Sequence, residues 1–263
     1  MQISGSTVLL TGATGGIGQA TARALQQQGA ELILTGRRTD VLEPLAAELG
    51  ARTLAVDLSV PAQVDRLVSE AGEIDILIAN AALPAAGRLD SFSMEQIDRA
   101  LNVNLRAPIA LAHALAPAMV ARGSGHLLFV SSLAGKTATA GSSLYNATKY
   151  GLRGFASALR AELHDHNVGV STVFPGFIRN AGMFAESGAK LPPGVGTRSP
   201  QDVANAVLSA IERNRGEVDV APMALRLGTV FGSLAPESAA RVTRRIGGDD
   251  IAKQLAAGQL DKR

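Results

Sequence analysis

The strongest constraint on the fold is a glycine-rich segment between an apolar run and a helix. Residues 6–11 are mostly apolar and predict a short buried strand, and helical spacing of alanine and leucine begins at Ala20. Residues 12–18 read Gly-Ala-Thr-Gly-Gly-Ile-Gly. Glycines here allow a tight turn and a close backbone approach to pyrophosphate, while the amino end of the next helix offers free N–H groups to the anion. The segment therefore predicts a strand, a phosphate-binding loop and a helix.

The rest of the chain alternates between strand-like and helix-like segments. Such alternation is typical of an α/β fold, here a single doubly wound, Rossmann-type parallel sheet with helices on both faces. With 263 residues, we expect one domain over 1–263, with a helical C-terminal extension from about residue 223. The further strands are expected at 31–35, 52–56, 74–79, 125–130 and 217–220.

Composition argues against several classes of function. The net charge is only +2 and aromatic residues make up 3%, which does not fit nucleic-acid binding. The chain has no cysteine, and its four histidines have no metal-ligand spacing, so we expect no metal site and a cytoplasmic location. No signal-type segment opens the sequence. The apolar stretch 107–121 is short and interrupted by prolines and a histidine, and we expect a buried helix rather than a membrane span.

A serine pair, a tyrosine and a lysine are expected to meet at one edge of the sheet. Ser131 and Ser132 end the strand at 125–130, and ligands of such sheets bind at the carboxyl ends of strands. Helical periodicity begins near Ser143 and places Tyr145 and Lys149 on one face, four residues apart. A lysine ammonium about 4 Å away, at an effective dielectric of about 20, favours the phenolate by about 4 kcal/mol. This predicts a Tyr145 pKa lowered toward neutrality, suited to acid–base catalysis.

The residues at the end of the second strand indicate which dinucleotide cofactor the protein prefers. A site for NAD usually has an acidic residue there, about 20 residues after the glycines. This chain has Arg37 and Arg38 instead, and its first carboxylate follows only at Asp40. Guanidinium groups bind phosphate in a bidentate manner, so we expect NADP(H), with NAD as the alternative.

Taken together, these motifs resemble the short-chain dehydrogenase/reductase family over nearly the whole chain. The family's Thr-Gly-x-x-x-Gly-x-Gly motif matches residues 11–18, and its Asn-Ala pair matches Asn80 and Ala81. Pro175-Gly176 closes a sixth strand as the family expects. The resemblance implies that the catalytic residues are Asn104, Ser132, Tyr145 and Lys149. Ser132 is selected over Ser131 by its separation from the tyrosine.

The resemblance also implies roles around the cofactor. Asp57 matches a residue that contacts the adenine, Ile178 a main-chain contact to the nicotinamide carboxamide, and Asn104 a residue that holds a water leading from the lysine to solvent. Asn180 stands where a threonine usually helps to hold the diphosphate, and asparagine can donate similarly. Ala79 and Ala82 also depart from the family pattern. The expected cofactor-binding residues are Gly12, Thr14, Gly16, Ile17, Gly18, Arg37, Arg38, Asp57, Leu58, Asn80, Tyr145, Lys149, Pro175, Ile178 and Asn180.

These features predict an NADP(H)-dependent oxidoreductase that exchanges hydride between nicotinamide and a carbonyl or secondary alcohol of a small, apolar substrate. Residues 181–198 are rich in glycine and proline and predict a mobile segment that caps this substrate. The alternatives are a lyase or epimerase with tightly bound cofactor, and a non-catalytic nucleotide-sensing module. We expect a homodimer or homotetramer. The apolar pocket candidates are Leu83, Leu133, Phe177, Met183 and Phe184.

The carboxyl end departs most from the family, and we expect it to affect assembly. Helix-like patterns cover 238–246 and 250–257. Arginines at 241, 244 and 245 and the basic pair 262–263 suggest contact with an acidic lipid surface. Since acidic residues at 249, 250 and 261 are mixed with them, a solvated helix face is the favoured interpretation, and membrane association is not expected.

Overall fold

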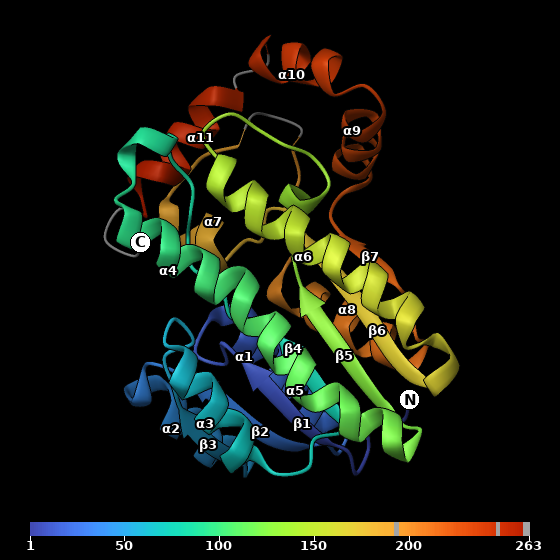
Figure 1. Ribbon diagram of the computed structural model, residues 1–263. Coiled ribbons are helices and arrows are strands. Elements are labelled where there is room, and N and C mark those ends of the chain that lie inside the picture. The colour runs from blue at the N-terminus through green and yellow to red at the C-terminus, as the bar shows by residue number, and fades with distance from the viewer. Residues whose placement is uncertain (192–194, 246–247, 260–263) are drawn as a thin grey trace.

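A computed structural model of the chain describes residues 1–191, 195–245 and 248–259. Within that part, seven parallel strands form one sheet in the order β3-β2-β1-β4-β5-β6-β7 (Figure 1). The doubly wound parallel sheet predicted from the sequence is confirmed. The strands are β1 Thr7–Thr11, β2 Glu31–Gly36, β3 Arg52–Ala55, β4 Ile76–Ala79, β5 Gly125–Val130, β6 Val168–Pro175 and β7 Glu217–Val220.

Helices cover both faces of the sheet because its central strands are apolar on both sides. Every residue of β4, β5 and β6 is buried, as continuous apolar runs in parallel sheets require. One apolar core joins the sheet to α3 Pro61–Ala71, α5 Ala107–Arg122 and α6 Ser143–Glu162. The opposite core joins it to α1 Gly16–Gln27, α2 Thr39–Leu49 and α8 Pro200–Glu212.

The order of the strands predicts where a ligand binds. From β1 the chain winds outward through β2 to β3, and then crosses back to β4 on the other side of β1. In open α/β sheets, ligands bind in the crevice at the carboxyl ends of the strands where the winding direction reverses. Here that crevice lies between the ends of β1 and β4, next to the glycine-rich loop.

The remaining helices lie mostly beyond the carboxyl ends of the strands. In Figure 1, α7 and the three tail helices gather on the side to which the arrow of β5 points. The tail forms three helices where the sequence pattern indicated two. These elements are α4 Met94–Leu101, the π-helical turn η2 Asn102–Arg106, the short 3₁₀ turns η1 Leu89–Ser91, η3 Leu133–Gly135 and η4 His164–His166, α7 Gly182–Ser187, α9 Met223–Leu234, α10 Pro236–Arg245 and α11 Gly248–Ala257.

Several expectations fall partly outside the described residues. Ile246, expected to end the first tail helix, and the charged residues 261–263 lie outside them, as do residues 192–194 of the expected capping segment. The fourth strand begins at Ile76 rather than at residue 74. The Asp75 carboxylate accepts a 2.8 Å hydrogen bond from the backbone N–H of Thr7, which places Asp75 at the edge of the sheet, before the strand.

Among the described residues, one helix has the length and apolar composition to cross a membrane. It spans Met94–Arg122 and so includes α4, η2 and α5. Its α5 segment contributes Leu111, Leu115 and Met119 to the core beneath the sheet. The segment therefore packs as a core helix of this fold, as expected for residues 107–121.

Candidate active site

Tyr145 and Lys149 lie one turn apart on α6, as the sequence predicts. The Lys149 side chain is 1% exposed, and its Nζ lies 5.7 Å from the centre of the Tyr145 ring. Nζ also donates a 3.1 Å hydrogen bond to the carbonyl oxygen of Val130, the last residue of β5. The lysine thus spans from the helix to the carboxyl end of a central strand.

The two serines after β5 have different partners. Ser132 Oγ accepts a 3.1 Å hydrogen bond from the backbone N–H of Ala134, and its hydroxyl lies near the Tyr145 phenol, whose pKa it lowers. Ser131 is buried and donates from Oγ to the backbone carbonyl of Lys149 at 3.2 Å. Ser132 is therefore the serine whose hydroxyl reaches the phenol, whereas Ser131 joins the strand end to the helix.

The pKa values in the protein alone run against the sequence expectation. Burial raises the pKa of Tyr145 to about 12, although the hydrogen bond from Ser132 opposes this shift. Burial also lowers the pKa of Lys149 to about 8. Removal from water penalises the charged form of each group, and this cost exceeds the attraction between them that the sequence argument used. The expectation that Lys149 brings the phenol toward neutrality is therefore wrong, because desolvation of the buried tyrosine dominates its pKa.

Asn146 is a structural residue that the sequence reasoning missed. Its Nδ2 donates to the carbonyl oxygens of Ala134 and Thr137, at 2.6 and 3.0 Å. These bonds fix the first turn of α6 to the loop that follows Ser132. Its position next to Tyr145 was the only available signal, since its partners are distant in the sequence.

Asn104 lies in the π-helical turn between α4 and α5 and is 1% exposed. Its Oδ1 accepts a 2.7 Å hydrogen bond from the backbone N–H of Leu83, and its Nδ2 donates to the Leu83 carbonyl at 2.9 Å. The amide thus holds the loop after β4, a task different from the water-holding role implied by the family resemblance. π-helical turns are frequent at functional sites because they disturb the regular hydrogen bonds of a helix. Because both ends of the Asn104 side-chain amide are bonded to Leu83, a water held at Asn104 would have to bind its backbone groups.

The glycine loop follows β1 with the tight geometry that its sequence requires. Gly12 has φ of +66°, and a Cβ there would lie 2.7 Å from the Cα of Ala81. A Cβ on Gly18 would lie 2.2 Å from the Gly12 carbonyl oxygen. Asn80 supports this loop, because its Nδ2 donates to the carbonyls of Thr11 and Gly12 at 3.0 and 3.1 Å. Asn80, predicted to bind the cofactor, thus holds the shape of this loop.

The amino end of α1 suits an anion. Gly15 precedes the helix without a capping side-chain hydrogen bond, and residues 16–19 contain no acid. The first N–H groups and the positive end of the helix dipole therefore face the loop uncompensated. From the other side, Ala181 closes on the loop, since a Cβ on Gly16 would lie 2.5 Å from the Ala181 Cβ. Its neighbour Asn180 adopts a left-handed backbone with φ of +64°.

Two arginines extend this positive region at the end of β2. Arg38 donates from Nη2 to the carbonyl of Thr14 at 2.6 Å, which places its guanidinium against the glycine loop. Arg37 Nη1 lies 3.6 Å from a carboxylate oxygen of Asp57. Burial alone would raise the pKa of Asp57, but hydrogen bonds from Ser59 and the charge of Arg37 keep it below its usual value. The loop, the helix end and the guanidinium groups together fit a dinucleotide with an additional phosphate.

Three other predicted residues are mostly enclosed by the fold. Leu58 and Ile178 are 8% and 3% exposed and pack into the two apolar cores, so that a contact with cofactor would use their main chain. The Pro175 carbonyl accepts a 3.5 Å hydrogen bond from Ser132 Oγ. The rings of Phe177 and of Phe184 on α7 lie 5.1 Å apart and form an aromatic pair.

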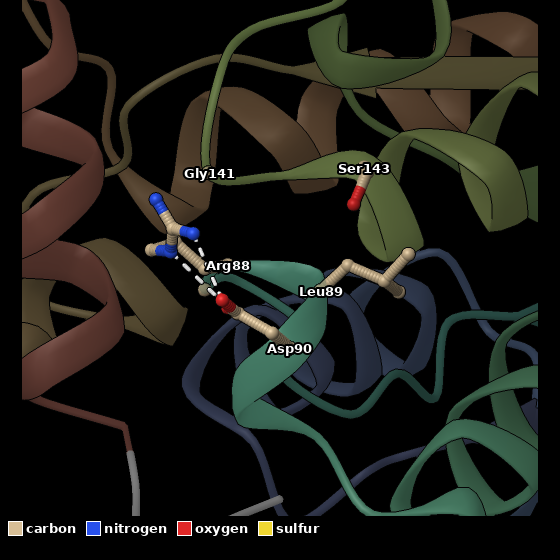
Figure 2. Close-up of a pocket in the computed structure, with 6 residues that line it drawn as sticks. Arg88, Leu89, Asp90, Gly141 and Ser143 are labelled. Carbon is tan, nitrogen blue, oxygen red and sulfur yellow. Dashed lines mark hydrogen bonds and ion pairs between the residues drawn. The ribbon is translucent and has the colours of Figure 1, made fainter.

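A hollow of about 520 Å³ lies in front of the first turn of α6 (Figure 2). Two loops form it, one with Gly87, Arg88 and Asp90 and one with Gly141 and Ser143. The backbone N–H of Gly87 donates to the Gly141 carbonyl at 2.7 Å and joins these loops, and Arg88 pairs with Asp90 at 2.8 Å. The hollow's one lining residue on α6 is Ser143, and neither Ser132, Tyr145 nor Lys149 lines it.

Comparison with known proteins defines the class. The model of the family described as short chain dehydrogenase matches residues 6–192, and the chain belongs to this family of oxidoreductases. It is 33% identical to the Ketoacyl reductase HetN of Nostoc sp., over 98% of this chain and 95% of the relative. A short-chain dehydrogenase from Sphingobium yanoikuyae in complex with NADPH has a TM-score of 0.77 at 28% identity, over 89% and 95% of the two chains. A metagenomic short-chain oxidoreductase in complex with NADP has a TM-score of 0.69 at 31% identity, over 84% and 97%.

Proposed function

We propose that this protein uses NADPH to reduce the carbonyl group of a small apolar substrate, with Ser132, Tyr145 and Lys149 as its catalytic residues and Asn104 as support. The observation that carries the proposal is the linked set at the end of β5. There the Ser132 hydroxyl lies near the Tyr145 phenol and lowers its pKa, and the buried Lys149 lies one turn further along α6. The NADP complexes of the related structures and the reductase name of the Nostoc protein support it.

The proton chemistry of the chain favours reduction. With a pKa of about 12, the Tyr145 phenol is protonated at neutral pH, which is the state that a proton donor needs. Ser132 donates its hydroxyl hydrogen bond to the same substrate oxygen and stabilises the negative charge that develops there. Lys149, with a pKa near 8, is largely charged at pH 7 and holds a proton close to the phenol. The bound cofactor supplies the hydride to the carbonyl carbon.

The positive region at the carboxyl ends of β1 and β2 would hold the cofactor. In this proposal the amino end of α1 binds the diphosphate, and Arg37 and Arg38 bind the 2′-phosphate. Leu83, Leu133, Phe177 and Phe184 form the apolar surroundings of the substrate. The cytoplasmic location and the homo-oligomeric assembly expected from the sequence belong to the proposal as well.

The test is a screen of ketones, 3-ketoacyl thioesters and secondary alcohols that follows NADPH absorbance. Once a substrate is found, Tyr145→Phe should lower kcat by about 10² to 10⁴, because it removes only the proton donor. The dissociation constant of NADPH should stay within a few fold. Tyr150→Phe is the matched control, because Tyr150 is the other tyrosine of the chain and is 41% exposed.

Two results would contradict the proposal. Wild-type reduction by Tyr145→Phe would remove the phenol from the mechanism. Binding of NADPH without net turnover of any carbonyl would favour the lyase, epimerase or nucleotide-sensing alternatives.

A further inference from the structure

The helix α9 turns a stripe of large apolar side chains toward solvent. Met223, Leu227, Val230, Phe231 and Leu234, here called the α9 stripe, are 62%, 63%, 56%, 47% and 81% exposed. At 3.6 residues per turn, these five positions fall within about 100° of the helix circumference. Contiguous exposed apolar patches of this kind mark interaction sites, whereas single exposed apolar residues do not.

The opposite side of α9 is fixed to the body of the protein. Leu225 packs against Leu133 and Phe174. Ser233 donates from Oγ to the Lys136 carbonyl at 3.0 Å. A Cβ on Gly232 would lie 2.6 Å from Oγ1 of Thr137, so the two backbones approach closely. These contacts set the rotation of the helix, and the stripe therefore cannot turn inward without losing them.

The stripe and the helix that follows it carry an excess of positive charge. Residues 223–245 contain four arginines and a single acidic residue, Glu237. Arg226 is exposed beside the stripe, and Arg241 and Arg244 are exposed on α10, which follows directly. Glu237 is paired with Arg241 at 3.6 Å. The two helices thus combine an exposed apolar stripe with an excess of positive charge, a combination found in helices that lie in a membrane interface.

Against the expectation from the sequence, we propose that α9 and α10 dock this protein on the surface of an anionic lipid bilayer, with the α9 stripe among the acyl chains and the arginines at the headgroups. A second copy of the chain fits less well. One face of a 12-residue helix is about 18 Å long and about 10 Å wide, a footprint far below the roughly 800 Å² per partner of a stable interface.

The docked orientation brings the candidate site close to the bilayer. The inner side of α9 contacts the loop from Leu133 to Thr137, which begins directly after Ser132. An apolar substrate dissolved in the membrane would therefore have a short path to the site. This step rests on the proposed function, but the docking itself does not require activity.

The experiment is co-sedimentation of the full chain with vesicles. Phosphatidylcholine vesicles with about a third phosphatidylglycerol should bind the protein, and pure phosphatidylcholine vesicles should bind it much less. Leu227→Glu with Leu234→Glu should weaken binding by about tenfold or more, because each buried leucine contributes substantially. Arg244→Glu should weaken it by about fivefold or more, since it removes one charge and adds the opposite one. Met94→Glu is the control, since Met94 is 68% exposed on α4 and outside the stripe.

The results of this experiment distinguish a lipid bilayer from a second copy of the chain as the partner of the α9 stripe. Loss of binding in the double variant but not in Met94→Glu would support docking, and unchanged NADPH binding and circular dichroism would show that the variants are folded. Equal binding to neutral and anionic vesicles, or no binding by the wild type, would overturn the proposal. If the wild type did not bind vesicles and the double variant had a smaller oligomeric mass in sedimentation, the stripe would be a subunit interface instead.

Discussion

Neighbouring side chains with similar sequence signals have different tasks in this protein. Arg37 and Arg38 follow the same strand, yet Arg38 bonds the glycine loop through the Thr14 carbonyl and Arg37 faces Asp57. The pair Ser131 and Ser132 divides in the same way, between the α6 backbone and the phenol. At this scale the direction of each side chain decides its role.

We predict that Arg37 determines the preference for NADPH over NADH. Arg37→Asp should place a carboxylate at the proposed 2′-phosphate position, so that NADPH loses a charged hydrogen bond worth about 1.5 to 3 kcal/mol, or roughly ten- to a hundredfold. NADH should gain a ribose partner, and the ratio of kcat/KM for NADPH and NADH should move toward NADH. Arg213→Asp makes the same change of charge after α8, before β7, and should leave the ratio unaltered. An unchanged ratio in Arg37→Asp would remove the phosphate-binding role.

Among the elements, α11 is joined to the short helix α7 beside the candidate site. Gln259 is 2% exposed and donates from Nε2 to the Met183 carbonyl at 2.7 Å. A Cβ on Gly258 would lie 2.2 Å from the Ser187 carbonyl oxygen. The backbone N–H of Lys190 donates to Oε1 of Gln254 at 2.9 Å. The tail thus holds the segment that the sequence predicts to cap the substrate, a link that points to a role besides assembly.

Breaking this junction should affect substrate more than cofactor. Gly258→Val should push α11 away from α7, since the new side chain would overlap backbone atoms. We expect KM for the substrate to rise severalfold while the NADPH dissociation constant stays within about twofold. Ala257→Ser changes an exposed neighbour on the same helix and serves as the control. Loss of NADPH binding with an unchanged KM would assign the tail to the cofactor site.

Across the whole molecule, the sheet between its two apolar cores encloses one titratable ring. His126 on β5 is 1% exposed, and its Nε2 lies 2.9 Å from Oγ of Ser171 on β6. Burial, together with the positive charges of the amino terminus and Arg160, lowers the pKa of His126 from 6.5 to about 3. Protonation of this ring is therefore tied to unfolding of the central strands.

The buried histidine predicts how the stability of the protein changes with pH. Between pH 6.5 and 3 the unfolded chain binds a proton at this histidine that the folded protein does not, so the free energy of unfolding must fall as the pH falls. The shift corresponds to up to about 5 kcal/mol. His126→Asn should flatten this dependence in urea unfolding measured from pH 7 to pH 4, whereas His113→Gln, a change at an exposed histidine, should not. Equal slopes in the wild type and His126→Asn would refute the assignment.

The amino-acid sequence was enough to predict the sheet, the glycine loop and the spacing of the candidate catalytic residues. These depend on local rules: apolar runs for buried strands, glycines for a tight turn, and a separation of four residues for one helix face. Arg37 and Arg38 were visible for the same reason, because their place after a strand is itself a local signal.

Three features could be seen only in the folded protein. Burial shifts the pKa values of Tyr145 and Lys149, and the side-chain amides of Asn104 and Asn80 form hydrogen bonds with particular backbone groups. In addition, the end of the tail after α11 is bonded to α7. Tertiary structure also decided that the apolar residues of α9 face outward. An apolar run in a sequence predicts a buried face, but which face is covered depends on segments far away in the chain, here Lys136 and Thr137. Desolvation and packing are sums over such distant neighbours, and no local pattern contains them.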